Sequence, residues 1–251
     1  MDKTTIWGLI TGIGMIMGGF LEEDGDPKGL LQISAAMIIF GGTSGVVLIC
    51  FPMSEIKRAG RMLKAIFVEK EVDEISLIEQ MVTVAEKARK DGILSLEEYV
   101  QSNELHPVFR KGLGLIVDGI EVQLVKEILE KTAALYEHQF HAASEVYEAA
   151  GGFCPTMGVV GTVLGLISVL GNISDPSTLG PKIALAFIAT FMGIFGANVI
   201  FLPFAAKLKA KGRKEKELND IIIEGLLSIQ AGENPRVIKD KLNVDLLEKF
   251  K

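Results

Sequence analysis

Charged residues are missing from four long stretches of this 251-residue chain, although 23% of all its residues are charged. The stretches cover residues 4–21, 30–52, 153–170 and 183–206, and none of them contains Asp, Glu, Lys, Arg or His. At a rise of about 1.5 Å per residue, helices of this length can cross a hydrocarbon core of about 30 Å, the two shorter ones only just. The sequence therefore predicts four transmembrane helices.

The absence of ionisable side chains from these stretches limits how the chain could move ions. A charged group inside a bilayer costs at least about 2.5 to 3.5 kcal/mol, and transport proteins keep one where something must hold the ion. If this chain takes part in ion transport, a partner subunit has to bring that group.

Cysteine and histidine are also scarce, with two and three residues respectively. Cys50 and Cys154 lack metal-ligand spacing, and His106, His138 and His141 have no carboxylate or thiol partners at useful spacing. The sequence shows no catalytic triad, phosphate loop or metal cluster, so we expect no enzyme activity, no cofactor and no bound metal. The net charge of −6 gives no electrostatic footprint for nucleic acid.

Helical periodicity continues through the charged parts of the chain. Apolar residues recur at helical spacing in residues 54–70, 73–91, 121–150 and 207–230, and strand alternation is absent. We expect the helix that starts at 121 to approach the third span, interrupted at Gly151, Gly152 and Pro155. The prediction is an all-α membrane protein whose central loop and tail together form one helical cytoplasmic domain.

The predicted organisation has four consecutive parts. They are 1–52 with the first two transmembrane helices, 53–152 with the central cytoplasmic segment, 153–206 with the third and fourth transmembrane helices, and 207–251 with the tail.

Basic residues flank the spans asymmetrically, which predicts the topology. Cations follow the second and fourth spans at Lys57, Arg58, Arg61, Lys64, Lys207, Lys209, Lys211, Arg213 and Lys214. The loop at 22–29 is acidic and the loop at 171–182 is nearly neutral. By the positive-inside rule, both termini and the central segment are cytoplasmic.

Thr162 and Thr190 are the polar side chains that lie deepest in the third and fourth spans. Thr162 is about 13 Å from the cytoplasmic start of its span and Thr190 about 10 Å from the outer start of its own, so both lie near the middle of the bilayer. A threonine hydroxyl in a helix most often binds its own i−4 carbonyl. Two hydroxyls at similar depth could instead line an ion path, and the sequence leaves both interpretations open.

Pro155 and Pro203 lie at the cytoplasmic ends of the third and fourth spans. Pro155 fits the first turn of a helix, where its missing N–H is not needed. Pro203 lies in a run that is helical on both sides, where proline frees a carbonyl and bends the helix. Two such prolines at one membrane level could couple events in the spans to the cytoplasmic domain.

Small residues are spaced four apart in all four spans, as at Gly8 and Gly12 or Gly161 and Gly165. This spacing lets helix backbones approach closely in lipid. The sequence does not separate contacts within one subunit from contacts with neighbours.

Arg89 lies near the end of a predicted helix, and Glu97 lies just beyond the glycine that follows it. Their positions alone indicate a solvated turn whose cations suit a helix C-terminus.

Six short motifs are spread along nearly the whole chain. They are ARKDGILSLE at 88–97, CPTMGVVGTVLGL at 154–166, AFIATFMG at 186–193, FLPFA at 201–205, IEG at 223–225 and NPR at 234–236. With the four spans and the large central loop, they make the chain resemble the flagellar stator family that includes MotA and its sodium-type relatives PomA and MotP. The third and fourth spans also suit the wider group of ExbB and TolQ, but those proteins have three spans and lack the segment at 88–97.

The resemblance implies a homopentamer around two copies of a single-span MotB-type partner, whose transmembrane Asp carries the ion. Arg89 and Glu97 would engage the rotor protein FliG, Thr162 and Thr190 would line the ion path, and Pro155 would act with Pro203 in coupling. The chain would then be a multi-pass protein of the bacterial inner membrane that serves flagellar motility and chemotaxis. The alternative is an ExbB/TolQ-like energiser of an envelope process, and a purely structural membrane scaffold stays open too.

The resemblance gives two opposing indications for the transported ion. Sodium-type relatives have a threonine where this chain has Thr162, which favours Na⁺. They also have paired threonines at the position of Ala189 and Thr190, and a tyrosine at the position of Met192, and these departures favour H⁺. We expect protons, with sodium as the alternative.

Overall fold

The computed structural model describes residues 2–68, 73–102, 105–171 and 176–248. Every regular element in these ranges is a helix, which confirms the predicted all-α fold. The chain divides into two compact units: unit 1 contains residues 1–69 and 140–210, and unit 2 contains residues 70–139 and 211–251. Central loop and tail thus fold together in unit 2, as predicted, whereas residues 53–69 and 140–152 pack with the apolar helices.

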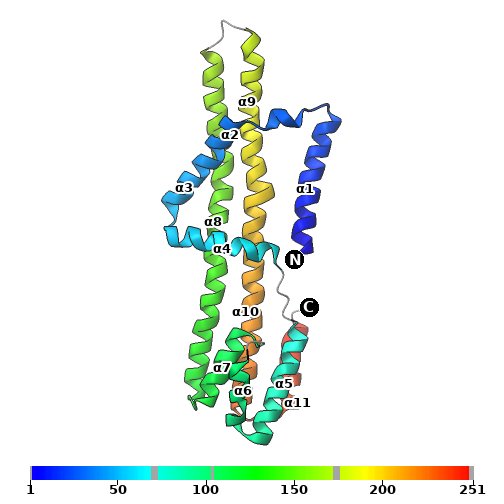
Figure 1. Ribbon diagram of the computed structural model, residues 1–251, viewed down its shortest axis with the longest axis vertical. Coiled ribbons are helices and arrows are strands. Elements are labelled where there is room, and N and C mark those ends of the chain that lie inside the picture. The colour runs from blue at the N-terminus through cyan, green and yellow to red at the C-terminus, as the bar shows by residue number, and fades with distance from the viewer. Residues whose placement is uncertain (1, 69–72, 103–104, 172–175, 249–251) are drawn as a thin grey trace. The chain divides into compact units, whose positions relative to one another are not determined.

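Unit 1 contains the apolar elements (Figure 1). The elements that lie wholly within the described part of this unit are α1 (Lys3–Glu22), η1 (Pro27–Leu30), α2 (Ile33–Ala36), η2 (Met37–Gly41), α3 (Gly42–Cys50), α4 (Met53–Phe67), α9 (Pro176–Phe195) and η4 (Gly196–Phe201). Two long helices, α8 (Val122–Leu170) and α10 (Leu202–Gln230), contribute residues to both units. Four helical segments, at Lys3–Glu22, Pro27–Cys50, Val122–Leu170 and Leu179–Gln230, are long and apolar enough to cross a membrane.

The long helix predicted to start at 121 is confirmed, but the predicted interruption where it reaches the third span is wrong. α8 passes through Gly151, Gly152 and Pro155 as one helix of 49 residues. Packing holds the helix on both sides of the two glycines, since Ala150 and Cys154 are both buried in hydrophobic clusters of unit 1. Tertiary contacts therefore override the low helix propensity of glycine and proline, which is a weak local preference.

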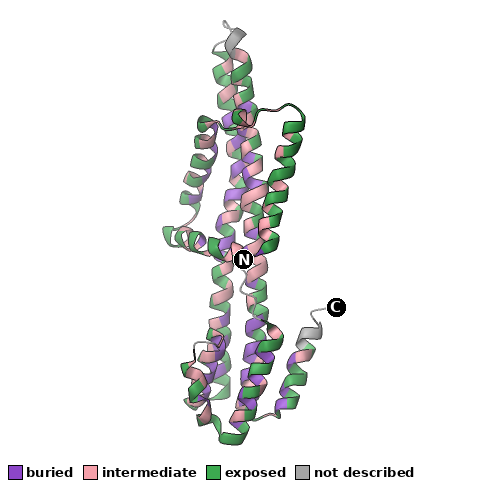
Figure 2. Ribbon diagram, turned by 45° about the vertical axis from the view of Figure 1, so that its right-hand side comes forward, coloured by how far each residue is buried: buried purple, intermediate pink, exposed green. Residues whose placement is uncertain are grey.

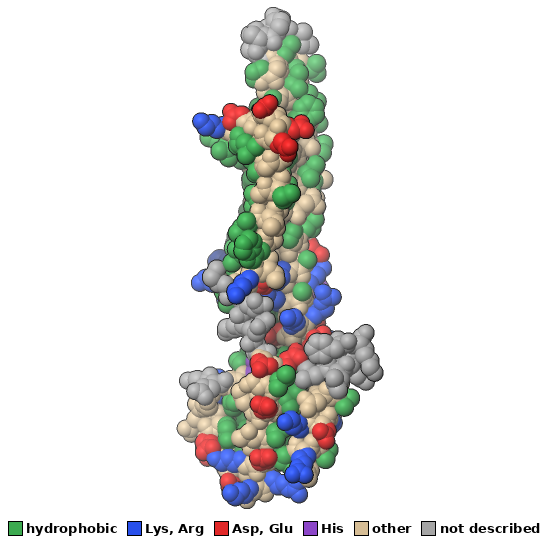
Figure 3. Space-filling view, turned by 90° about the vertical axis from the view of Figure 1, so that its right-hand side faces the viewer, with side chains coloured by type: hydrophobic (Ala, Val, Ile, Leu, Met, Phe, Trp, Pro, Cys, Tyr) green, Lys and Arg blue, Asp and Glu red, His purple; other side chains and the backbone are tan. Residues whose placement is uncertain are grey.

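Helix α1 differs from the other spans because none of its residues is buried (Figure 2). Large apolar side chains of this helix are exposed, Trp7 to 65% and Met15 to 79%. The face drawn in Figure 3 likewise shows hydrophobic side chains along the apolar helices, with charged ones gathered mainly on other segments. Such a helix needs lipid or another protein around it.

Unit 2 is a helical domain around one apolar core. Its remaining elements are α5 (Glu74–Asp91), η3 (Ile93–Leu96), α6 (Glu97–Gln101), α7 (Pro107–Val117) and α11 (Pro235–Glu248). Asp73 caps α5 by accepting a hydrogen bond from the N–H of Ile75 (3.1 Å), and Gly92 ends that helix with a φ of 85°. A side chain would be strained at this φ, so glycine allows the sharp turn into η3.

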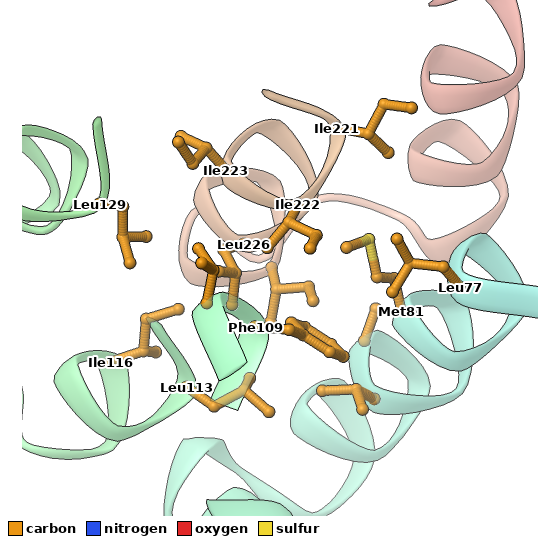
Figure 4. Packing of buried hydrophobic residues seen from close by; sticks show 14 of the residues in the cluster. Leu77, Met81, Phe109, Leu113, Ile116, Leu129, Ile221, Ile222, Ile223 and Leu226 are labelled. Atoms are coloured by element: carbon orange, nitrogen blue, oxygen red, sulfur yellow. The ribbon is translucent and has the colours of Figure 1, made fainter. Parts of the chain in front are cut away.

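Phe109 lies at the centre of this core, between Met81, Leu113 and Leu226 (Figure 4). We expect Phe109→Ala to lower the free energy of unfolding by about 3 to 5 kcal/mol, because the buried ring leaves a cavity. The midpoint of a denaturant titration, followed by circular dichroism of the detergent-solubilised protein, measures this change.

Ile75→Ala is the matched control, because Ile75 belongs to the same unit and is 63% exposed. Its midpoint should stay close to that of the wild type. Equal losses in the two variants would contradict the assignment of Phe109 to the core.

Candidate functional site

Helices α8 and α9, which lie side by side in Figures 1 and 2, cross at close range in unit 1. A Cβ added at Gly193 would lie 2.8 Å from the carbonyl oxygen of Cys154 and 3.0 Å from the Cα of Gly158. A Cβ at Gly158 would lie 3.0 Å from the carbonyl oxygen of Ala189. The two backbones are thus in contact, which small residues permit in a membrane where lipid gives no drive for association.

Thr162 of α8 and Thr190 of α9 meet one turn beyond this crossing. Their hydroxyl oxygens are hydrogen-bonded to each other. The Thr162 hydroxyl also lies 3.1 Å from the carbonyl oxygen of Gly158 and 2.9 Å from that of Ala186. The i−4 bond and the interhelical contact are therefore both present.

These four oxygens form a polar cluster in an otherwise apolar helix pair. A hydroxyl donates one hydrogen bond, so Thr162 cannot donate to both carbonyls at once, and at least one of these oxygens keeps a lone pair for another donor or a cation. Both threonine side chains are half-buried, so one side of the cluster stays accessible. The arrangement can offer oxygen ligands to a cation, or hydrogen bonds to a carboxyl group of another chain.

The two prolines lie inside continuing helices. Pro155 is in the interior of α8, so the first-turn interpretation is wrong. Pro203 is preceded by the π-helical segment η4, where the N–H of Leu202 donates to the carbonyl of Ala197. The wider π turn ends at Phe201, two residues before Pro203, which lacks an N–H, and this lets the helix continue past the proline.

Arg89 and Glu97 lie on the surface of unit 2. Arg89 is in the last turn of α5, Glu97 is the first residue of α6, and both side chains are exposed. A buried Leu96 holds the intervening turn on the core, and Lys87 forms an ion pair with Glu98 beside it. Within the described residues, neither Arg89 nor Glu97 takes part in such an ion pair, so both charges are available to another molecule.

Unit 1 holds a further polar group that sequence patterns do not reveal. Asp2 is buried and forms an ion pair with Lys207 at the start of α10. The only signal in the sequence was an aspartate directly before an apolar helix, which is a favoured N-cap residue.

Comparisons with known proteins agree with this geometry. The profile of the MotA/TolQ/ExbB proton channel family matches residues 100–221, and the profile of the Motility protein A N-terminal region matches residues 6–92. The second profile covers the first two spans and Arg89, which favours the Motility protein A type over the ExbB type.

Individual relatives match over nearly their whole length. An uncharacterised Bacillus subtilis protein, YtxD, is 34% identical over 97% of this chain and 90% of its own. Motility protein A of Helicobacter pylori is 37% identical over 96% of this chain and 94% of its own.

Two solved structures share the fold. The structure of MotAB from C. jejuni has a TM-score of 0.92 and 31% identity, and covers 98% of this chain and 96% of the matched chain. The flagellar MotAB stator complex of Bacillus subtilis has a TM-score of 0.90 and 33% identity, with coverages of 97% and 96%. The chain is a multi-pass membrane protein that belongs to the MotA/TolQ/ExbB proton channel family and, within it, to the Motility protein A type.

Proposed function

We propose that this chain is the ion-conducting A subunit of a flagellar stator, which converts ion flow into torque on the rotor protein FliG. The observation that carries the proposal is the Thr162–Thr190 oxygen cluster, set between two spans that contain no ionisable residue. The full-length likeness to two MotAB structures supports the same assignment. The chain supplies oxygen atoms for an ion path but no carboxylate to carry the ion.

A MotB-type partner with one transmembrane helix supplies that carboxylate. Five copies of this chain surround two copies of the partner in the bacterial cytoplasmic membrane. Both termini and unit 2 lie on the cytoplasmic side, in accord with the basic residues that follow the second and fourth spans. Unit 2 therefore presents Arg89 and Glu97 to the rotor.

Ion binding to the partner's carboxylate removes a buried charge and ion release restores it. Each elementary charge that crosses 100 mV yields about 2.3 kcal/mol, which limits the work of one step. The changing charge alters how the partner helix packs against α8 and α9, and the A ring steps around the partner dimer. Pro155 lies in α8 and Pro203 in α10, the two helices that contribute residues to both units, so they serve as points of bending.

Protons are the proposed ion, with sodium as the alternative. Ala189 and Met192 stand where sodium-type relatives of this family have oxygen-bearing side chains. A path with fewer oxygen ligands suits a proton carried on a carboxyl group better than a cation that must shed its water. The Thr162 hydroxyl, which already contacts two carbonyls, is placed to hydrogen-bond that carboxyl group.

The experiment compares the wild type with Thr162→Val in cells that depend on this chain and its partner for motility. Wild-type swimming speed should be indifferent to sodium at fixed pH and should stop with a protonophore. Thr162→Val keeps the shape of the side chain but removes the hydroxyl. Losing one hydrogen bond of about 1 to 1.5 kcal/mol to the ion carrier should slow conduction about tenfold.

Thr11→Val is the matched control, because the Thr11 hydroxyl binds, within the part of the chain that the structure describes, only carbonyls of its own helix, those of Trp7 and Gly8. It should swim at wild-type speed. Speed that follows sodium and survives the protonophore would assign sodium instead. Unchanged speed and ion flux in Thr162→Val would remove Thr162 from the ion path and favour a scaffold.

A further inference from the structure

The N-terminus of α1 is tied to the cytoplasmic end of the fourth span by an ion pair between a buried carboxylate and a half-buried lysine. Asp2 is 1% exposed, and its carboxylate oxygen Oδ2 lies 2.6 Å from the Nζ of Lys207. The other carboxylate oxygen, Oδ1, accepts hydrogen bonds from the Thr4 hydroxyl (2.7 Å) and the N–H of Thr5 (3.1 Å). Lys207 also donates to the Thr4 hydroxyl (3.3 Å). Both carboxylate oxygens therefore have a partner.

The same group of residues includes the end of α4. The N–H of Asp2 donates to the carbonyl of Phe67 (2.8 Å), which is the last residue of that helix. The ring of Phe67 packs edge-to-face on Phe204, with 5.6 Å between ring centroids. We call Asp2, Thr4, Phe67, Phe204 and Lys207 the N-terminal clamp. All five residues belong to unit 1.

The carboxylate of Asp2 stays ionised in this setting. Burial alone would raise its pKa, but the hydrogen bonds from Lys207, Thr4 and the N–H of Thr5, with the charge of Lys207, hold the pKa below its usual range. Removing Lys207 is therefore costly, because the buried carboxylate of Asp2 would lose its charged partner.

The position of the clamp suggests what it does. Phe204 directly follows Pro203, and Lys207 lies one helical turn beyond that proline. Helix α1 has no buried residue of its own, and the contacts of Lys207 with Asp2 and Thr4 join its N-terminal end to α10. Any bending of α10 at Pro203 would pull on α1 and α4 through Lys207 and Phe204.

We propose that the Asp2–Lys207 pair is a positioning pair that holds the helix beyond Pro203 against α1 and α4, so that ion-driven movement reaches unit 2. This inference rests on the proposed stator function and deepens it. Asp2 and Lys207 touch neither the ion nor the rotor, and they act through the helix that carries Pro203. Weakening the pair lowers the torque obtained per conducted ion and leaves the ion path open.

The test separates torque from ion flux with variants that keep local structure. Asp2→Asn preserves the helix cap, since asparagine caps as well as aspartate, but it removes the charge. Lys207→Gln removes the opposite charge. Three quantities are measured: the level of the chain in the membrane, the inward proton flux with an intracellular pH indicator, and the rotation speed of tethered cells.

We expect each single variant to keep its membrane level and proton flux and to lower rotation speed by roughly tenfold, because Lys207→Gln leaves the buried Asp2 carboxylate without its charged partner and Asp2→Asn removes the ionic contact to α10. The double variant Asp2→Asn with Lys207→Gln should be no slower than either single variant, since two neutral amides can hydrogen-bond to each other. Lys209→Gln is the matched control on the same helix: Lys209 pairs with Glu148 at the same 2.6 Å distance, but both side chains are exposed. It should rotate at wild-type speed.

Three outcomes overturn the inference. Unchanged rotation in both single variants removes the pair from coupling. A fall in membrane level that matches the fall in rotation makes the pair purely structural, and a matching fall in proton flux assigns it to the ion path. A wild type that conducts protons but turns no rotor instead contradicts the proposed function, together with the coupling role that depends on it.

Discussion

Arg89→Glu should stop rotation while proton flux through the stator continues. Arg89 is an exposed cation at the end of α5, and within the described residues it has no ion-pair partner, so its charge is free to face another protein. Placing like charges against each other across an interface costs several kcal/mol, which corresponds to a loss of more than about 100-fold in binding. Rotation speed and intracellular acidification are measured in the same cells.

Glu97→Lys, which replaces a negative charge by a positive one, should likewise stop rotation while proton flux continues. Glu97 begins α6 on the same turn of unit 2, and the buried Leu96 beside it keeps the turn in place after the substitution. A reversed charge on the rotor surface should restore rotation to each variant separately, which distinguishes an electrostatic contact from a folding defect.

Lys90→Glu is the control for this pair of variants. Lys90 is the next residue after Arg89 and is also exposed, but it points about 100° away around the helix. It should lower rotation far less than Arg89→Glu. Equal effects at the two positions, or a loss of proton flux in Arg89→Glu, would contradict a rotor contact at Arg89.

The exposed position of Arg89 and Glu97 could be predicted from the sequence, because local signals are enough to identify a polar turn at the surface. Gly92 marks the end of a helix, and charged residues on both sides of it indicate a solvated turn. The four spans could be predicted equally well, since a long run without charged residues is recognised from composition alone. The association of the central loop with the tail follows from the predicted topology, in which both lie on one side of the membrane.

Other features depend on contacts between distant residues, and the sequence could not supply them. Gly151 and Pro155 predicted an interruption between the long helix and the third span, yet packing around Ala150 and Cys154 keeps α8 continuous. The depth of Thr162 and Thr190 could be estimated from spacing, but their direct hydrogen bond depends on how closely two helices cross. Asp2 and Lys207 are more than 200 residues apart, so their ion pair has no local signature.

The glycines of the spans are a further case in which spacing in the sequence does not identify the contacts. All four spans carry small residues four apart, and spacing alone does not tell which of them are in contact. A Cβ at Gly8, Gly12 or Gly41 would meet nothing within 4 Å, whereas one at Gly158 or Gly193 would meet the opposite backbone. The structure therefore assigns the glycines of the α8–α9 crossing to contacts within the subunit.

Gly193→Ala should abolish both proton flux and rotation, because it forces apart the two helices that hold the threonine pair. The new Cβ would lie 2.8 Å from the carbonyl oxygen of Cys154 and 3.0 Å from the Cα of Gly158. These are backbone atoms, so no side-chain rotation relieves the clash. Overpacking of this kind costs about 1 to 3 kcal/mol, and the oxygens of Thr162 and Thr190 lose their hydrogen-bond geometry when the helices separate.

Gly152→Ala is the matched control, since Gly152 lies on α8 in the same unit, is exposed, and has open space where the Cβ would go. Alanine is a better helix former than glycine by about 1 kcal/mol, so this variant should be at least as stable as the wild type and should conduct and rotate normally. Membrane level, proton flux and rotation speed are compared for the two variants. Gly193→Ala with normal flux would show that the crossing tolerates separation and that the threonine hydroxyls do not need each other to conduct, whereas loss of both activities at normal membrane level would place the ion path at this crossing.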